Sequence, residues 1–357
     1  MANNNFSLGS SLLVPSLQEL AKESNLTVPS RYIRTEQDRL VSISDDDHGL
    51  HFLDQIPVID LQKLISDESA ELAKFHSACK DWGFFQLVNH GVSSSLVEKT
   101  MTEMQNILKL PLEEKKKFRQ NSEEVEGFGQ AFVLSEEQKL DWNDPMVLTT
   151  LPVSVRKPHL IPKLPSTFRE TLDIYSLELK DLAICLIEQM EKVLKVEEKE
   201  VSGLFEDGLQ AMRLNLYPPC PQPEKVIGLT PHSDASGVSI LLQTHDVVGL
   251  QVKKDGNWVP VKPIQNAFVI NIGDVLEMIT NGEYRSIEHR VITNVQKERF
   301  SLATFYNPSL ESEIGPNHRF ITEQSPPKYK RLGMQEYMRG YFSRELDSKS
   351  YLDAMKL

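Results

Sequence analysis

A histidine and an aspartate stand two residues apart in the stretch GLTPHSDASGVSILLQ (228–243). In an extended segment, residues i and i+2 point to the same side, so the side chains of His232 and Asp234 converge. An imidazole beside a carboxylate is typical of a metal site or a catalytic pair. The chain has nine histidines, and one such pair also arises by chance, so the surrounding residues must decide.

A third candidate ligand is His289, in the segment YRSIEHRVIT (284–293). Ile287 and Val291 share its face of a predicted strand, whereas its immediate neighbours are charged. A histidine satisfied within the core is the simpler interpretation of this position. Two imidazoles and one carboxylate, however, form the facial triad of non-haem Fe(II) oxygenases, which leaves three metal positions open.

The segment RFSLATF (299–305) places Arg299 and Ser301 on one strand face, and both faces carry apolar residues. An arginine in a covered position is costly unless an anion and further hydrogen bonds satisfy it. No acidic residue stands at period-two spacing. A bound carboxylate, held by the guanidinium fork and the serine hydroxyl, would meet the need. The alternative is a surface arginine with an apolar stem.

The overall charge excludes two classes of partner. The 357 residues carry a net charge of −12, which argues against nucleic acids and anionic membranes, because both attract basic surfaces. The one dense basic run, EKKKFR (114–119), lies beside acidic SEEVE (122–126) and is interpreted as a solvated helix end. The expected partner is a small molecule.

Three cysteines, Cys79, Cys185 and Cys220, are widely separated, and no C-x-x-C motif occurs. This pattern argues against a disulfide framework or a thiolate zinc site and fits a reducing compartment. The sequence also lacks a signal-peptide pattern and an apolar run of 18 residues. We therefore expect a cytoplasmic protein that does not span a membrane and is a monomer.

The first half of the chain predicts an extension and an α/β region. Residues 1–53 form the extension, with a short helix at 16–23 that begins with a capping-box pattern of Ser16 and Glu19, and an acidic loop at 44–49. The α/β region covers 54–165. Its expected elements are a strand at 56–61, a helix at 68–83, a strand at 84–91, a helix that ends near Leu110, and an irregular, proline-containing segment at 123–165. EGFG (126–129) lacks the third glycine of a dinucleotide fingerprint, so a Rossmann fold is rejected.

The second half predicts a mostly β core. A long helix at 166–196 opens the connection 166–207, and its apolar stripe indicates core packing. Short strands with turn signals fill 208–308, including a hairpin at Asp255-Gly256. This texture favours a double-stranded β-helix, or jelly roll, flanked by helices. The tail 309–357 returns to helix at 336–343 and 351–357.

On these residues the chain resembles the plant Fe(II)/2-oxoglutarate-dependent dioxygenases over nearly its whole length. The segments that carry the resemblance are DWGFFQLVNHG (81–91), EGFGQAF (126–132), NLYPPCPQP (215–223), HSD (232–234), EHR (288–290) and RFS (299–301). Within the family, the chain is similar to the branch of senescence-related proteins, codeine and thebaine demethylases and the dioxygenase-like norcoclaurine synthase.

The resemblance implies residue roles. His232, Asp234 and His289 would bind Fe(II), and Arg299 and Ser301 the distal carboxylate of 2-oxoglutarate. Asn215 and Tyr217 match positions that help to hold the iron-chelating end of this cosubstrate. Dioxygen is the second cosubstrate, and ascorbate is expected to support turnover.

The implied reaction hydroxylates or O-demethylates a small, apolar aromatic or alkaloid-like plant metabolite, with release of succinate and carbon dioxide. Flavonoids or phenylpropanoids are alternative substrates within the family. The expected lining of the pocket is Phe128, Phe132, Leu216, Phe305 and Tyr341, with the 123–146 segment as a candidate lid. A metal-dependent hydrolase and a non-catalytic jelly-roll binding protein are the more distant alternatives.

Overall fold

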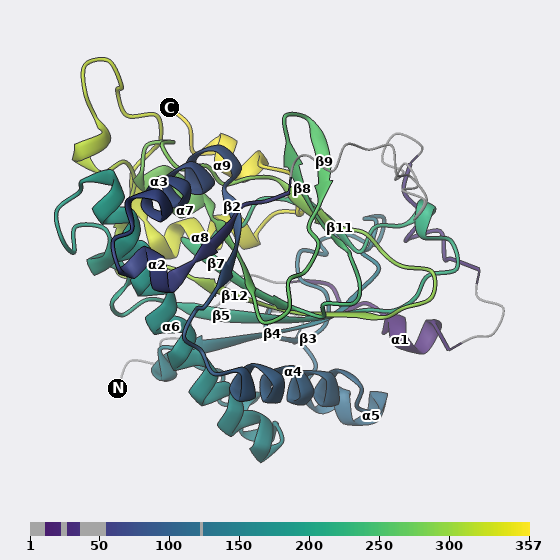
Figure 1. Cartoon of the computed structure of the whole chain (residues 1–357). Helices are drawn as coiled ribbons and strands as arrows, with labels where there is room; N and C mark the ends of the chain where they lie inside the picture. Colours follow the sequence, from purple (N-terminus) through teal and green to yellow (C-terminus); the bar gives the residue numbers. More distant parts are fainter. Residues whose placement is uncertain (1–10, 23–26, 36–54, 122–123) are drawn as a thin grey trace.

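The computed structural model describes residues 11–22, 27–35, 55–121 and 124–357. Its centre is an eight-stranded sheet with the strand order β1-β2-β10-β7-β12-β5-β4-β3 (Figure 1). The strands are β1 Val58–Asp60, β2 Phe84–Val88, β10 Phe268–Ile272, β7 Val238–Gln243, β12 Arg299–Tyr306, β5 Gln210–Tyr217, β4 Asp144–Leu151 and β3 Gly127–Phe128. Only β1 and β2 are parallel within this sheet. Strands from 54–165 and from 208–308 thus share one sheet.

A second, four-stranded sheet has the order β6-β11-β8-β9. Its strands are β6 Leu229–His232, β11 His289–Val291, β8 Leu250–Lys254 and β9 Asn257–Pro260. Apolar side chains of the two sheets pack against each other, for example Phe84 and Val269 of the large sheet with Val252 of the small one. The predicted hairpin joins β8 to β9, with positive φ at both Asp255 and Gly256. Two facing antiparallel sheets confirm the predicted jelly roll.

Two long helices cover the outer face of the large sheet. The described helices are α1 Leu17–Leu20, α2 Leu61–Ile65, α3 Ser69–Ser77, α4 Ser94–Leu108, α5 Leu112–Lys115, α6 Ser166–Leu194, α7 Asp274–Ile279, α8 Met334–Phe342 and α9 Ser350–Ala354. The short strands β13 Glu313–Ile314 and β14 Leu332–Gly333 form a separate pair. Helices α4 and α6 pack together beneath β4 and β5 (Figure 1). Leu172, Leu179 and Leu186 of α6 are buried, so the predicted apolar stripe is core.

The prediction of an irregular 123–165 segment was wrong in part. Residues Asp144–Leu151 form β4, which is buried along its whole length and pairs with β5. The prolines obscured this strand. Pro145 lies near its start, where a missing N–H is tolerated, and Pro152 follows its end. The remaining Val and Thr residues favour a strand.

The predicted capping box at α1 was also wrong. Ser16 makes no capping bond from its side chain, and its hydroxyl donates instead to Asp144 Oδ2 at 2.8 Å. Asp144 accepts the backbone N–H groups of Leu17 at 2.8 Å and Gln18 at 2.9 Å. A carboxylate from β4 therefore caps the helix, which a local sequence pattern cannot predict.

The sequence suggested that the basic run 114–119 is a solvated helix end, but the structure shows that the run is only partly exposed. Lys116 and Lys117 are exposed and pair with Glu113 and Glu114, but Lys115 is buried. The predicted acidic loop at 44–49 lies outside the described residues. In the described part of the chain, no helix combines the length and the apolar character that crossing a bilayer requires.

Candidate metal centre and active site

The two candidate histidine ligands lie at the same level of the small sheet. His232 is the last residue of β6, His289 is the first of β11, and the two are direct partners in the antiparallel register. Their ring centroids are 4.2 Å apart, and both side chains are buried. Neighbouring positions on paired strands share a face, so both imidazoles point to the space between the sheets.

Asp234 completes the cluster from just beyond the end of β6. Its Oδ1 lies 3.5 Å from Nε2 of His232 and 3.6 Å from Nε2 of His289. Its other oxygen, Oδ2, accepts hydrogen bonds from Ser239 at 2.7 Å and Asn271 at 2.8 Å. One carboxylate oxygen is thus held by the protein, and the other is presented to the two imidazoles.

The protonation states suit a metal. Nδ1 of His232 lies 2.8 Å from the carbonyl of Thr230, and Nδ1 of His289 lies 3.2 Å from that of Ile287. A proton on each Nδ1 leaves the Nε2 lone pairs free for coordination. Burial, with a contribution from His232, lowers the pKa of His289 to about 4. Burial opposes ionisation of Asp234, but the two imidazoles and Asn271 outweigh it and hold the pKa of this carboxyl well below its usual range.

This donor set fits a divalent transition metal. The three ligand atoms lie within 4.8 Å of one another, with one oxygen and two imidazole nitrogens on one side of a cavity. Such a facial arrangement leaves the opposite coordination positions open to small oxygen ligands.

Arg299 lines the same cavity. Its guanidinium is buried, and Nη2 donates to Gln243 Oε1 at 2.6 Å, whereas Nε and Nη1 have no hydrogen-bond partner among the described residues. Burial lowers its pKa, so the charge is poorly compensated. Gly249 leaves room for the arginine stem, because a Cβ there would lie 2.8 Å from Cδ of Arg299. The two unpaired donors fit a carboxylate ligand.

Ser301, Asn215 and Tyr217 surround this arginine. Strand pairing sets Tyr217 opposite Arg299 and Asn215 opposite Ser301. The guanidinium lies 5.2 Å from the centroid of the Tyr217 ring, and Asn215 Nδ2 donates to Ser301 Oγ at 3.4 Å. Tyr217 and Asn215 therefore contact Arg299 and Ser301, the two residues predicted to bind the distal carboxylate.

The cavity is lined by both polar and apolar side chains. It is lined by the three candidate metal ligands and by Phe84, Arg213, Asn215, Tyr217, Leu229, Ser239, Leu241, Leu250, Asn271, Val291, Arg299, Ser301, Ala303 and Phe305. Phe305 is the one residue of the five predicted for the substrate pocket that lines this cavity. Register places it directly opposite Ser239, which holds Asp234.

The other four predicted pocket residues do not line this cavity. Leu216 points to the opposite face of β5 and packs in the helix-covered core, because it alternates with Asn215 and Tyr217. Phe128 also lies on that face. Phe132 and Tyr341 line a small neighbouring hollow and meet edge to face with centroids 5.3 Å apart.

The expected lid segment contacts a second hollow next to the cavity. This hollow of about 220 Å³ is lined partly by residues 130–133, and it shares Arg213 and Leu229 with the cavity. Phe132 from this segment stacks on Phe342 of α8 at 5.1 Å. The segment and α8 therefore contact each other through these two rings.

Sequence reasoning missed four polar residues of the site: Ser239, Asn271, Gln243 and Arg213. Each stands on a strand of the large sheet, and either lines the cavity or shares a strand face with a residue that does. Arg213 lies two residues before Asn215, so the alternation that placed Asn215 and Tyr217 could also have placed it. Its Nε is buried without a partner, and within the described residues no carboxylate oxygen lies within 4.0 Å of its guanidinium.

The C-terminal tail closes onto the strand that carries His232. The backbone N–H of Ser348 donates to the carbonyl of Pro231 at 2.8 Å, and the N–H of Ser233 donates to the carbonyl of Ser348 at 3.1 Å. The Ser348 hydroxyl also donates to Glu288, the neighbour of His289. One tail residue thus contacts both histidine-bearing segments.

Comparison with known proteins agrees with this geometry. Residues 208–308 match the model of the 2OG-Fe(II) oxygenase superfamily, and residues 56–164 match that of the N-terminal region of a non-haem dioxygenase in morphine synthesis. The chain is similar to the solved structure of JOX2 in complex with 2OG, Fe and JA, with a TM-score of 0.87 and 34% identity over 96% of this chain and 98% of that one.

Curated relatives match over nearly the full length. Protein SRG1 of Arabidopsis thaliana is 54% identical, covering 98% of both chains. The oxoglutarate-dependent flavonoid 7-O-demethylase 1 of Ocimum basilicum is 53% identical over 98% of this chain and 93% of its own. Codeine O-demethylase of Papaver somniferum is 48% identical over 98% of both. The chain belongs to the 2OG-Fe(II) oxygenase superfamily and is a 2-oxoglutarate-dependent Fe(II) dioxygenase.

Proposed function

We propose that His232, Asp234 and His289 hold the Fe(II), and that Arg299 and Ser301 bind the distal carboxylate of 2-oxoglutarate. The observation that carries the metal assignment is the position of Asp234 Oδ1, which faces Nε2 of both histidines. The unpaired Nε and Nη1 of Arg299 support the second assignment. Bound Fe(II) with 2-oxoglutarate supplies the activation of dioxygen for oxidation of a C–H bond.

The protein's own residues orient this chemistry. Ser239 and Asn271 fix the rotation of the Asp234 carboxylate, while the carbonyls of Thr230 and Ile287 fix the histidine tautomers. Arg299 sets the distance of the cosubstrate from the metal centre. Apolar walls from Leu241, Leu250 and Val291 exclude water from the reacting carbon.

For the organic substrate, we propose a small, largely apolar aromatic or alkaloid-like plant metabolite, which is hydroxylated or O-demethylated. Phe305 supplies a flat apolar wall beside the ligands of the metal. Arg213 stands where the cavity meets the adjoining hollow and suits an oxygen acceptor at the far end of the substrate. Two relatives are named as O-demethylases of alkaloids or flavonoids.

A methoxylated flavonoid is the second candidate substrate, favoured by the 53% identity to the flavonoid 7-O-demethylase.

We also propose a cytoplasmic location, because all three cysteines are free thiols, as is usual in a reducing compartment. The proposed oligomeric state is a monomer. Size-exclusion chromatography tests the oligomeric state, and imaging of a fluorescent fusion tests the location.

The test of the metal assignment is Asp234→Ala. This variant should lose iron binding and turnover while its circular dichroism spectrum is retained. Retained stoichiometric iron would refute the assignment.

A panel of methoxylated alkaloids and flavonoids, scored by substrate-stimulated release of succinate and formaldehyde, tests the substrate class. Stimulation only by non-aromatic acids would refute it.

A further inference from the structure

A separate hollow of about 300 Å³ lies on the outer face of the large sheet. Its walls include Phe128 and Asp144, which the register places opposite Met146 and Leu216 respectively. Leu216 points away from the metal cavity, so this hollow is on the other side of the sheet from the metal centre. Its volume is at the lower end of the range of small-molecule sites, roughly 300–1,000 Å³.

The hollow is lined by a buried lysine whose ammonium group has no ionic partner in the described part of the chain. Lys115 is 2% exposed, and its Nζ lies 4.8 Å from the centroid of the Phe128 ring. Among the described residues, no carboxylate oxygen lies within 4.0 Å of this Nζ. Burial lowers the pKa of Lys115 to about 8, although Asp144 and Glu19 act in the opposite direction.

The nearby carboxylates are engaged elsewhere. Asp144 accepts three hydrogen bonds at the start of α1, and Glu19 pairs with Lys22 at 2.7 Å. Neither therefore compensates the Lys115 charge in full. Folding has already incurred the free-energy cost of desolvating the Lys115 ammonium. An anion that binds to it offsets this cost through electrostatic attraction, so anion binding is favourable.

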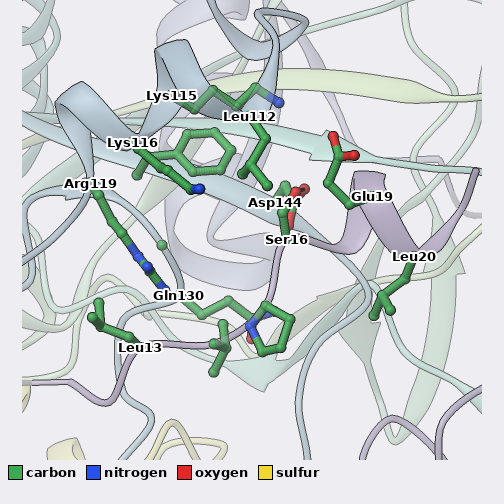
Figure 2. A pocket seen from close by; sticks show the side chains of 14 residues that line it. Leu13, Ser16, Glu19, Leu20, Leu112, Lys115, Lys116, Arg119, Gln130 and Asp144 are labelled. Carbon is green, nitrogen blue, oxygen red and sulfur yellow. Dashed lines mark hydrogen bonds between the residues drawn. The ribbon is translucent and has the colours of Figure 1, made fainter.

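The remaining walls are mostly apolar. They are formed by Leu13, Val14, Pro15, Leu20, Leu112 and Phe128. Figure 2 shows Lys116 and Arg119 across the hollow from Glu19 and Leu20. Lys116 pairs with Glu113, whereas in the described ranges the Arg119 guanidinium has no carboxylate within 4.0 Å. The site therefore combines an apolar surface, one buried lysine and, at its rim, one arginine that has no carboxylate partner among the described residues.

We propose that this hollow is a second ligand site, distinct from the metal cavity, that binds a small apolar acid with its carboxylate or phenolate on Lys115. The apolar body of the ligand packs between the N-terminal segment Leu13–Leu20 and the side chains of Leu112 and Phe128. Binding joins the N-terminal segment to α5 and β3. The site does not depend on the proposed substrate or on any residue that holds the metal.

The test uses the full chain loaded with Mn(II) and N-oxalylglycine, a non-reactive analogue of 2-oxoglutarate. The probe is 2-naphthoate, followed by isothermal titration calorimetry. Lys115→Met should weaken binding by a factor of about 10 to 100, the usual loss for a hydrogen bond to a charged group. Lys117→Met is the matched control, because Lys117 is exposed and pairs with Glu114. Lys115→Arg should retain most of the affinity.

Neutral 2-naphthalenemethanol provides a measurement on the unaltered protein, which is informative even if Lys115→Met fails to fold. It should bind more weakly than naphthoate by a similar factor. Phe305→Trp narrows the metal cavity and should leave naphthoate binding unchanged. The proposal is overturned if the unaltered protein does not bind naphthoate, if Lys115→Met binds it as tightly as the unaltered protein, if the alcohol binds as tightly, or if Phe305→Trp abolishes binding.

Discussion

Asn271 donates a hydrogen bond of 2.8 Å to Oδ2 of Asp234 and thereby turns Oδ1 toward the two histidines. Asn271 interrupts the apolar strand FVINI and is itself buried. Partners of metal ligands of this kind typically contribute a factor of about 10–100 in metal affinity. Asn271→Ala should therefore weaken Co(II) or Fe(II) binding by about that factor, measured by competition with a chelator.

The matched control is Asn257→Ala, since Asn257 is exposed on β9. It should bind the metal as the unaltered protein does. Unchanged metal affinity in Asn271→Ala would show that Ser239 alone fixes the carboxylate.

Arg299→Leu should lower the affinity for 2-oxoglutarate. Loss of the guanidinium leaves a buried carboxylate unpaired, at a cost of about 3–5 kcal/mol, or roughly two to three and a half decades in affinity. The measurement is the apparent KM for 2-oxoglutarate in the succinate assay. Arg290→Leu is the control, because Arg290 stacks on Trp258 outside the cavity. An equal loss in both variants would point to general destabilisation.

Phe305→Ala should uncouple the reaction. The Phe305 ring lines the same cavity as the proposed metal ligands. A phenyl ring forms no conventional hydrogen bond, so its loss removes none from the residues proposed to bind iron or 2-oxoglutarate. Substrate oxidation should fall or move to another carbon, while substrate-free decarboxylation of 2-oxoglutarate persists. Product analysis by mass spectrometry and carbon dioxide release measure the two separately.

Phe128→Ala is the comparison for this variant, since its ring lies on the opposite face of the sheet. It should leave the ratio of the two activities unchanged. If Phe305→Ala lowers both activities together, Phe305 supports the fold or the metal centre and not the substrate.

Lys115→Met should stabilise the free protein at neutral pH. The folded chain lowers the pKa of Lys115 from 10.5 to about 8, so below pH 8 the lysine is charged in both states and folding bears the full desolvation cost. This cost disappears as the pH rises from about 8 toward 10.5. The variant should be more stable by about 1–3 kcal/mol at pH 7, after allowance for solvent screening, and the difference should vanish above pH 10.5.

Urea unfolding of both proteins at pH 7, 9 and 10.5 measures this difference, with Lys117→Met as the control. A constant difference across this range would mean that packing, and not charge, distinguishes the methionine variant.

The elements with strong local patterns could be predicted from the sequence. The apolar stripe of α6 and the Asp255-Gly256 hairpin are properties of a few consecutive residues, and both were confirmed. The sequence also identified His232, Asp234, His289, Arg299 and Ser301 as candidates, and the structure places all five around one cavity. Their residue types are unusual inside apolar strands, which is why they stand out.

Features that depend on distant segments could not be predicted. The capping of α1 by Asp144 joins residues more than a hundred positions apart, and the burial of Lys115 depends on how the N-terminal segment packs. Leu216 is a different case. Alternation along β5 sets it on the opposite strand face from Asn215 and Tyr217, where it packs in the helix-covered core.

The contact of Ser348 with β6 has a consequence for the order in which the enzyme is built. His232, the first of the three proposed metal ligands, leaves the ribosome more than a hundred residues before Ser348, whose backbone contacts its neighbours Pro231 and Ser233. A nascent chain that stops before residue 348 carries all three proposed ligands but lacks this flanking segment. We therefore expect the proposed metal centre to reach its final geometry only late in synthesis.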